Sequence, residues 1–253
     1  MTQDGAIPAT RAVTPLGWLL IGFRLVLMVL VFMLCAPLHL LWRAFGFGRF
    51  WPRVFLASIG AIAGLHITVR GQPARHALLL SNHVSWLDIP TLAHVTGSAF
   101  VAHDGLADFV FLKWLCEMND TIFIARHDRQ SVAEQVEQVR AAMATGGALT
   151  IFPEGTTSDG TGLLPFKSAL LSAATPLPPG IVAQPVSLDY ENSRQVCWVG
   201  DEPGLDNFLR LLARPRPIRV TAHFLAPLAG EELADRKAMA ATAHAKLLRH
   251  LSQ

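Results

Sequence analysis

The sequence contains few charged residues and few cysteines. Only 16 % of its 253 residues are charged and 51 % are hydrophobic, whereas about a quarter of a typical soluble domain is charged. The three cysteines, Cys35, Cys116 and Cys197, lie far apart without paired or metal-ligand spacing, so we expect buried free thiols. A glycine-rich dinucleotide motif and a phosphate loop are also lacking, so the sequence predicts no nucleotide cofactor, no catalytic metal and no nucleic-acid partner.

Acidic residues are almost absent from the first 64 residues, where Asp4 is the only one. Five arginines in the same region against this one aspartate give a local net charge of +4, whereas the whole chain carries +2. Between these arginines, Leu16 to Trp42 contains one charged residue, Arg24, and is near the length that spans a bilayer. This pattern favours membrane association with the active site on the cytoplasmic side, over a buried core helix or a signal peptide.

The sequence divides into three regions. Residues 1–14 are polar and small, and we expect a disordered lead. Residues 15–64 predict a pair of membrane-associated helices, broken near Pro37 and the arginine-rich turn that follows, with a spanning and a re-entrant arrangement both open. Residues 65–253 alternate short apolar runs with helical patterns, which predicts an α/β fold with a mixed, partly parallel sheet covered by helices.

The pattern of apolar residues places the individual elements. The strand candidates are 67–69, 77–81, 99–102, 121–125, 148–152, 181–188, 196–199 and 219–224. The helix candidates in the same region are 86–94, 109–118, 131–144, 167–173, 205–212 and 231–251.

Two polar segments each follow an apolar run of strand character. The first, Asn82-His83-Val84-Ser85-Trp86-Leu87-Asp88, follows the run at 77–80, and the second, Phe152-Pro153-Glu154-Gly155-Thr156, follows the run at 148–151. Polar loops at the ends of rigid strands are a common arrangement of an active site. Four residues separate His83 from Asp88, so the carboxylate can bind one imidazole nitrogen while the other takes a proton from a hydroxyl.

These motifs resemble those of the glycerolipid acyltransferase family, which includes the lysophosphatidic acid acyltransferases. The resemblance covers roughly residues 65–190 and includes two further blocks, Ile122-Phe123-Ile124-Ala125-Arg126 and Ile181-Val182-Ala183-Gln184-Pro185-Val186. It implies an α/β acyltransferase domain with an N-terminal membrane-docking helical pair. The implied reaction moves a fatty acyl group from acyl-CoA or acyl-carrier protein to the hydroxyl of a lysophospholipid. The first expectation is 1-acyl-sn-glycerol-3-phosphate as acceptor, which gives phosphatidic acid.

Each motif residue has an expected role. His83 is the expected general base, and Asp88 orients it. Ser85 either assists the oxyanion or caps the following helix. Glu154 either accepts hydroxyl groups of the acceptor or stabilises its own tight turn, where Gly155 leaves backbone amides free for an anionic group.

The remaining site candidates concern the head group of the acceptor. Thr156 completes the second motif and belongs to the expected substrate-binding residues. Arg126 and Lys167 are fixed cations near the motifs, and each is a candidate partner for a phosphate or carboxylate, with a solvated surface charge as the alternative.

The sequence departs from the family pattern at two positions that bear on the head group. Many relatives that use glycerol 3-phosphate have an arginine where this chain has Thr157, and a lysine where it has His103. Both changes remove a fixed positive charge, so a lyso-ornithine lipid or another lysolipid is the alternative acceptor. Two further alternatives are a non-catalytic lipid-binding protein of the same fold, which would not need the His83 and Asp88 pair, and a hydrolase that uses water as acceptor.

Overall fold

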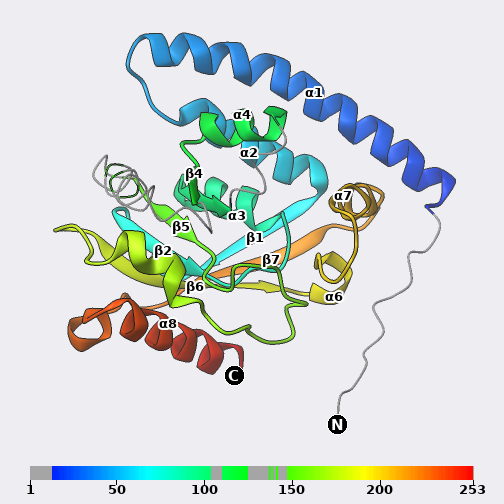
Figure 1. Ribbon diagram of the computed structural model, residues 1–253. Helices are drawn as coiled ribbons and strands as arrows, with labels where there is room; N and C mark the ends of the chain where they lie inside the picture. Colours follow the sequence, from blue (N-terminus) through cyan, green and yellow to red (C-terminus); the bar gives the residue numbers. More distant parts are fainter. Residues whose placement is uncertain are drawn as a thin grey trace.

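The computed structural model describes residues 13–103, 110–124, 137, 139, 141 and 147–252 (Figure 1). Most of the predicted polar lead lies outside these residues. So does most of the helix predicted at 131–144, although residues 137, 139 and 141 are helical.

A seven-stranded sheet forms the centre of the fold. Its strands lie in the order β1-β7-β6-β2-β5-β3-β4, and neighbours are parallel except for β6 and β7. The strands are β1 Leu65–Arg70, β2 Ala77–Ser81, β3 Ala99–His103, β4 Ile122–Ile124, β5 Leu149–Ile151, β6 Val182–Tyr190 and β7 Ile218–Phe224. The predicted mixed, partly parallel sheet is therefore confirmed.

Helices cover both faces of this sheet. The helices are α1 Pro15–Ala44, α2 Phe50–Ala63, α3 Asp88–Thr96, α4 Val110–Met118, α6 Ser193–Val196, α7 Gly204–Leu212 and α8 Arg236–Leu251. Figure 1 shows α1 to α4 on one side of the sheet and α8 on the other. The central strand β2 is buried at all five positions because both its faces are covered: Leu79 packs in one hydrophobic cluster, and Leu78 and Leu80 pack in the other.

The predicted N-terminal helical pair is present, with its break after Ala44 rather than at Pro37. Thr14 caps α1 by accepting a hydrogen bond from Gly17 N at 3.1 Å, and the helix then continues through Pro37. It is long and apolar enough to cross a membrane. Large side chains along it, including Trp18 and Phe23, are exposed, which suggests membrane association.

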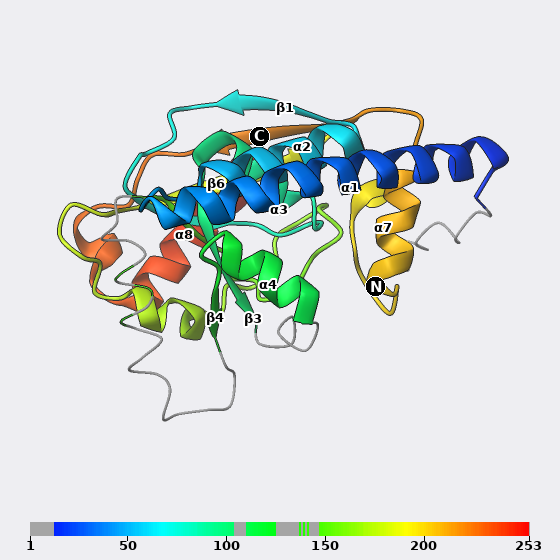
Figure 2. The same ribbon diagram turned by 90° about the horizontal axis from the view of Figure 1, so that it is seen from above.

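One face of α1 is nevertheless attached to the α/β domain. Figure 2 shows α1 lying across the domain, with its first half beside α7. The single charge of the apolar run, Arg24, donates from one guanidinium nitrogen to the carbonyl oxygens of Leu212 at 2.8 Å and Arg214 at 3.0 Å. Arg24 therefore binds free carbonyl groups at the end of α7, where a cation is favoured.

The structure corrects the predicted elements at three places. The strand predicted at 196–199 is wrong, because Ser193–Val196 is helical and Trp198 N donates to the carbonyl oxygen of Val84, in the loop that follows β2. The helix predicted at 231–251 is interrupted: a 3-10 turn occupies Gly230–Leu233, and Asp235 in extended conformation caps α8. The segment predicted as a helix at 167–173 forms a 3-10 helix, Ser168–Ala174.

Candidate active site

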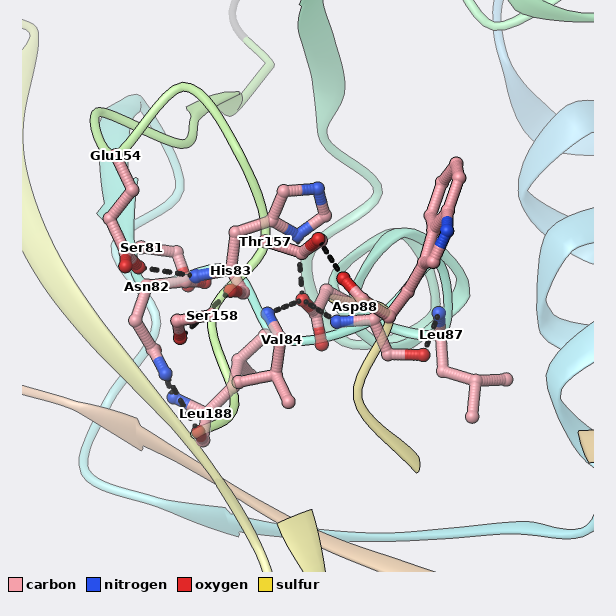
Figure 3. A network of polar contacts seen from close by, with 12 residues as sticks. Ser81, Asn82, His83, Val84, Leu87, Asp88, Glu154, Thr157, Ser158 and Leu188 are labelled. Carbon is pink, nitrogen blue, oxygen red and sulfur yellow. Dashed lines mark hydrogen bonds and ion pairs between the residues drawn. The ribbon is translucent and has the colours of Figure 1, made fainter. Parts of the chain in front are cut away.

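The first motif begins where the chain leaves β2. Asn82 is buried, and its side chain bonds to the backbone of the neighbouring strand β6. Its Nδ2 donates to Leu188 O at 3.0 Å, and its Oδ1 accepts from Leu188 N at 2.7 Å. This two-sided contact holds the start of the loop against the sheet (Figure 3). The next residue, His83, therefore leaves a fixed point of the core.

Asp88, at the first position of α3, is fully buried and accepts four hydrogen bonds. One carboxylate oxygen faces Nδ1 of His83 at 2.7 Å and accepts from Val84 N at 2.7 Å and Ser85 N at 3.0 Å. The other oxygen accepts from the hydroxyl of Tyr190 at 2.6 Å. An ionised carboxylate only accepts, so Nδ1 carries the proton and Nε2 is left with its lone pair.

Asp88 and Phe152 hold the imidazole of His83, while its outer nitrogen stays accessible. The imidazole stacks on Phe152, with ring centroids 4.1 Å apart and an interplanar angle of 15°. Figure 3 shows one ring nitrogen directed at Asp88 and the other directed away from the network. The side chain is 20 % exposed and lines a cavity, so a bound hydroxyl can reach it from that cavity.

Glu154 connects the second motif to the first. It is 1 % exposed; one carboxylate oxygen accepts from His83 N at 2.7 Å and the other accepts from Leu164 N at 3.0 Å. Burial raises the pKa of Glu154 to about 7, against the opposing effect of these two backbone N–H groups. Because both oxygens are used by the backbone, the geometry favours the turn-stabilising interpretation, and the binding of acceptor hydroxyls stays a prediction.

The other predicted site residues fall into three groups. Gly155, Thr156 and Lys167 lie together: Gly155 and Thr156 line the cavity, and a side chain at 155 would come within 3.1 Å of Lys167 Nζ. Ser85 is fully buried, with its hydroxyl 3.4 Å from Leu87 N, which favours a role in the turn before α3 over one at the oxyanion. Arg126 lies outside the described residues.

The cavity beside His83 has a volume of about 1000 Å³. Its described walls come from α2, α3, β3, α4, β5, the 3-10 helix at 168–174, and the two segments 152–157 and 198–202. Most of these side chains are apolar, including Phe55 and Ile59 of α2 and Leu115 of α4. The second helix of the N-terminal pair, α2, therefore forms part of the cavity beside His83.

Several residues of this site were missed by sequence reasoning. Tyr190 is the only tyrosine in the sequence and stands at the end of β6, but no spacing links it to Asp88. Burial and the charge of Asp88 raise the pKa of the Tyr190 phenol well above its ordinary value, so it remains a donor. Asp201 and Glu202 line the cavity from a segment that the sequence predicted to follow a strand.

Comparison with known proteins shows the family of this chain. A lyso-ornithine lipid O-acyltransferase of Rhodobacter capsulatus is 34 % identical over 201 residues, which cover 76 % of this chain and 72 % of that protein. A model of the family described as acyltransferase matches residues 66–189. The chain belongs to the acyltransferase family. This acyltransferase is also 37 % identical over 120 residues to a 1-acyl-sn-glycerol-3-phosphate acyltransferase of Neisseria gonorrhoeae, with 46 % and 47 % of the two chains covered.

The fold of the acyltransferase is shared with a solved structure. The crystal structure of the 1-acyl-sn-glycerophosphate acyltransferase PlsC from Thermotoga maritima superposes with a TM-score of 0.61 at 20 % identity, over 92 % of this chain and 96 % of that one. The similarity includes the N-terminal pair of helices and the sheet, so the predicted fold and the resemblance to lysophospholipid acyltransferases are confirmed.

Proposed function

We propose that this acyltransferase moves a fatty acyl group from a thioester donor to the hydroxyl of a lysolipid, with His83 as general base. The contact between His83 Nδ1 and Asp88 at 2.7 Å carries the proposal. It sets the tautomer in which Nε2 faces the cavity as an acceptor. The buried Tyr190 and the two backbone N–H groups orient Asp88 and stabilise its charge.

The reaction follows from this arrangement. Nε2 of His83 takes the proton of the acceptor hydroxyl as its oxygen attacks the thioester carbonyl. The carbon–oxygen bond forms, the carbon–sulfur bond breaks, and the leaving thiolate takes the proton from the imidazolium. The products are an ester and a free thiol, and the resting tautomer of His83 is restored. Asp88 stabilises the imidazolium without itself being protonated.

The apolar walls of the cavity suit an acyl chain. Side chains of α2 and α4 line it, and so do Phe152, which stacks on His83, and Phe100, which stacks on Phe152. An acyl chain placed there would leave water and bring its carbonyl to the imidazole. Acyl-CoA and acyl-carrier protein both present such a chain on a thioester, and both fit the proposal.

For the acceptor, a lyso-ornithine lipid is better supported than 1-acyl-sn-glycerol-3-phosphate. The relative named for lyso-ornithine lipid matches over 72 % of its length, whereas the glycerol-phosphate relative matches over 47 %. The chain has Thr157 where an arginine would favour a phosphate, and its side chain donates to the carbonyl oxygen of Trp198. Among the described residues lining the cavity, the carboxylates of Asp201 and Glu202 occur without any lysine or arginine.

The exposed apolar face of α1 supports work at a membrane surface. Leu30, Met33 and Leu34 are each more than half exposed along one helix whose other side packs on the domain. The basic N-terminal region supports the cytoplasmic side, where anionic lipids attract arginine. The two substrates would then reach the cavity from the bilayer and from solution.

The test is an assay of free-thiol release from acyl-CoA or acyl-carrier protein in detergent or vesicles. Lyso-ornithine lipid, 1-acyl-sn-glycerol-3-phosphate, lysophosphatidylcholine and no acceptor are compared at equal concentration. Release that depends on lyso-ornithine lipid, with formation of the diacyl product, supports the proposal. Release without an acceptor identifies a hydrolase, and binding of lipid without release identifies a lipid-binding protein.

A further inference from the structure

One wall of the cavity is the segment 198–202 between α6 and α7, which carries both carboxylates found among the described lining residues. Its start is connected to the loop after β2 that carries His83, because Trp198 N donates to Val84 O at 3.0 Å. The carbonyl oxygen of the same tryptophan accepts from Thr157. The segment is therefore attached to Val84, next to His83, and to Thr157, which directly follows the second motif.

The two acidic residues of this wall differ in their partners. Glu202 binds the guanidinium of Arg210 through Nε at 2.7 Å and through a second nitrogen at 3.0 Å, and it accepts from Asn207 at 2.7 Å. This two-point ion pair neutralises its charge and lowers its pKa, against the opposing effect of burial. The Trp198 indole also donates to the carbonyl oxygen of Glu202 at 2.8 Å, which closes the turn. Glu202 therefore serves the structure of the wall.

Asp201 is the second carboxylate of this wall. It is exposed in the turn, lines the cavity that contains His83, and has no ion pair or hydrogen bond from its side chain among the described residues. Because Glu202 is paired with Arg210, and the described lining contains no lysine or arginine, Asp201 is the unpaired formal charge of this part of the cavity. A wall of this kind attracts a cation and repels a phosphate.

We infer that Asp201 binds the ammonium group of the acceptor head group and thereby selects an amino-bearing lysolipid over a lysophosphatidate. The inference rests on the proposed transfer to a lysolipid hydroxyl. It makes Asp201 a specificity-determining residue, while His83 performs the chemistry. The turn closed by Glu202 holds Asp201 in place, so a head group bound there would place the acceptor relative to Nε2.

The experiment measures kinetics of the full-length enzyme with three acceptors. They are lyso-ornithine lipid, the same lipid with its free amino group acetylated, and 1-acyl-sn-glycerol-3-phosphate. Asp201→Asn should raise the KM for lyso-ornithine lipid about 5- to 30-fold, the range expected for one charge-assisted contact, with little change in kcat or in the KM for the donor. With the acetylated lipid, the variant and the wild type should have equal KM.

The matched control is Asp206→Asn. Asp206 is an exposed aspartate in the first turn of α7, outside the cavity lining, so the variant loses the same charge without touching the acceptor. It should behave as wild type with all three lipids. Asp201→Lys provides a second measurement, because it should weaken lyso-ornithine lipid further and improve 1-acyl-sn-glycerol-3-phosphate.

The outcomes separate this inference from the proposed function. An unchanged KM of Asp201→Asn for lyso-ornithine lipid, or an equal rise with the acetylated lipid, overturns the role of Asp201 and leaves the transferase proposal standing. Wild-type enzyme that accepts only 1-acyl-sn-glycerol-3-phosphate overturns both the ornithine acceptor and the ammonium site. Wild-type enzyme that releases thiol with no lysolipid at all overturns the transferase proposal itself.

Discussion

The two motif segments hold the same residue, His83, but in different ways. In the segment 82–88, Asp88 binds the imidazole ring, so the contact sets which nitrogen is free. In the segment 152–156, Glu154 accepts from the backbone N–H of His83 and from that of Leu164, so the contact sets where the loop lies. Both carboxylates are buried and fully hydrogen-bonded. The difference teaches that a buried acid in a conspicuous motif can serve either the chemistry or the scaffold, depending on what its partners are.

The most severe test of this comparison is His83→Ala. Loss of a general base should lower kcat by about 10²–10⁴-fold or more. Thermal unfolding should change little, because the imidazole is partly exposed and Asp88 keeps its two backbone donors and Tyr190. Thiol release with lysolipid and the melting temperature are measured together. Activity close to wild type in the folded variant would remove His83 from the mechanism.

The next largest effect is expected for Tyr190→Phe. This change keeps the ring in the core and removes the hydroxyl that donates to Asp88 at 2.6 Å. We expect kcat to fall about 10-fold, as for a lost interaction of about 1.4 kcal/mol that supports the transition state, with KM for both substrates retained. A loss of stability with kcat unchanged would mean that the phenol serves packing only.

Glu154→Gln should act on stability more than on chemistry. An amide has one acceptor oxygen and cannot satisfy both backbone N–H groups, which should cost about 1–3 kcal/mol of unfolding free energy. Chemical denaturation measures this loss of unfolding free energy. The control is Glu191→Gln, the same substitution at an exposed position. A drop in kcat as large as that of His83→Ala, at unchanged stability, would instead place Glu154 in the reaction.

Glu154 also predicts a dependence of stability on pH. Its pKa in the folded protein is about 7, above the ordinary value of 4.5, so the folded state binds more protons between these values. The contribution of Glu154 to the free energy of unfolding is present at low pH and is lost as pH rises through 7. Unfolding free energies of wild type and Glu154→Gln, measured from pH 5 to pH 8, should therefore differ in slope. Parallel curves would show that the carboxyl is already ionised at pH 5.

The smallest effects are expected at Thr157, which directly follows the second segment. Thr157→Arg introduces a cation into the cavity that Asp201 also lines, so KM for lyso-ornithine lipid should rise a few-fold, in line with about 0.5–1 kcal/mol for a partly exposed pair. Use of 1-acyl-sn-glycerol-3-phosphate should be retained or improved. Thr157→Val is the control, because it removes the contact with Trp198 without adding charge. Equal effects of both variants on both lipids would show that residue 157 does not take part in recognising the head group.

Much of the fold followed from local pattern. Strands β2 and β7 and helices α4 and α7 lie within one residue of their predicted bounds, because apolar periodicity reports which face a segment buries. The prediction failed at 196–199, where Val196 and Cys197 pack in a hydrophobic cluster and Trp198 N donates to Val84 O instead of pairing with a strand. It also failed at Asp235, since an acid within a helical pattern and an acid at its cap differ only in backbone conformation.

The sequence by itself determined the pairing of His83 with Asp88. The two residues lie five positions apart, between the end of a strand and the start of a helix, so the local chain can bring their side chains together. It also determined the apolar, basic N-terminal pair and membership of the family. Only the tertiary structure decided which residues support His83 and Asp88. Tyr190 lies 102 residues from Asp88 and Glu154 lies 71 residues from His83, and they meet because β6 and β5 both flank β2. The contacts of Arg24 and the place of Asp201 in the cavity wall are likewise set by packing between distant segments, which no local spacing encodes.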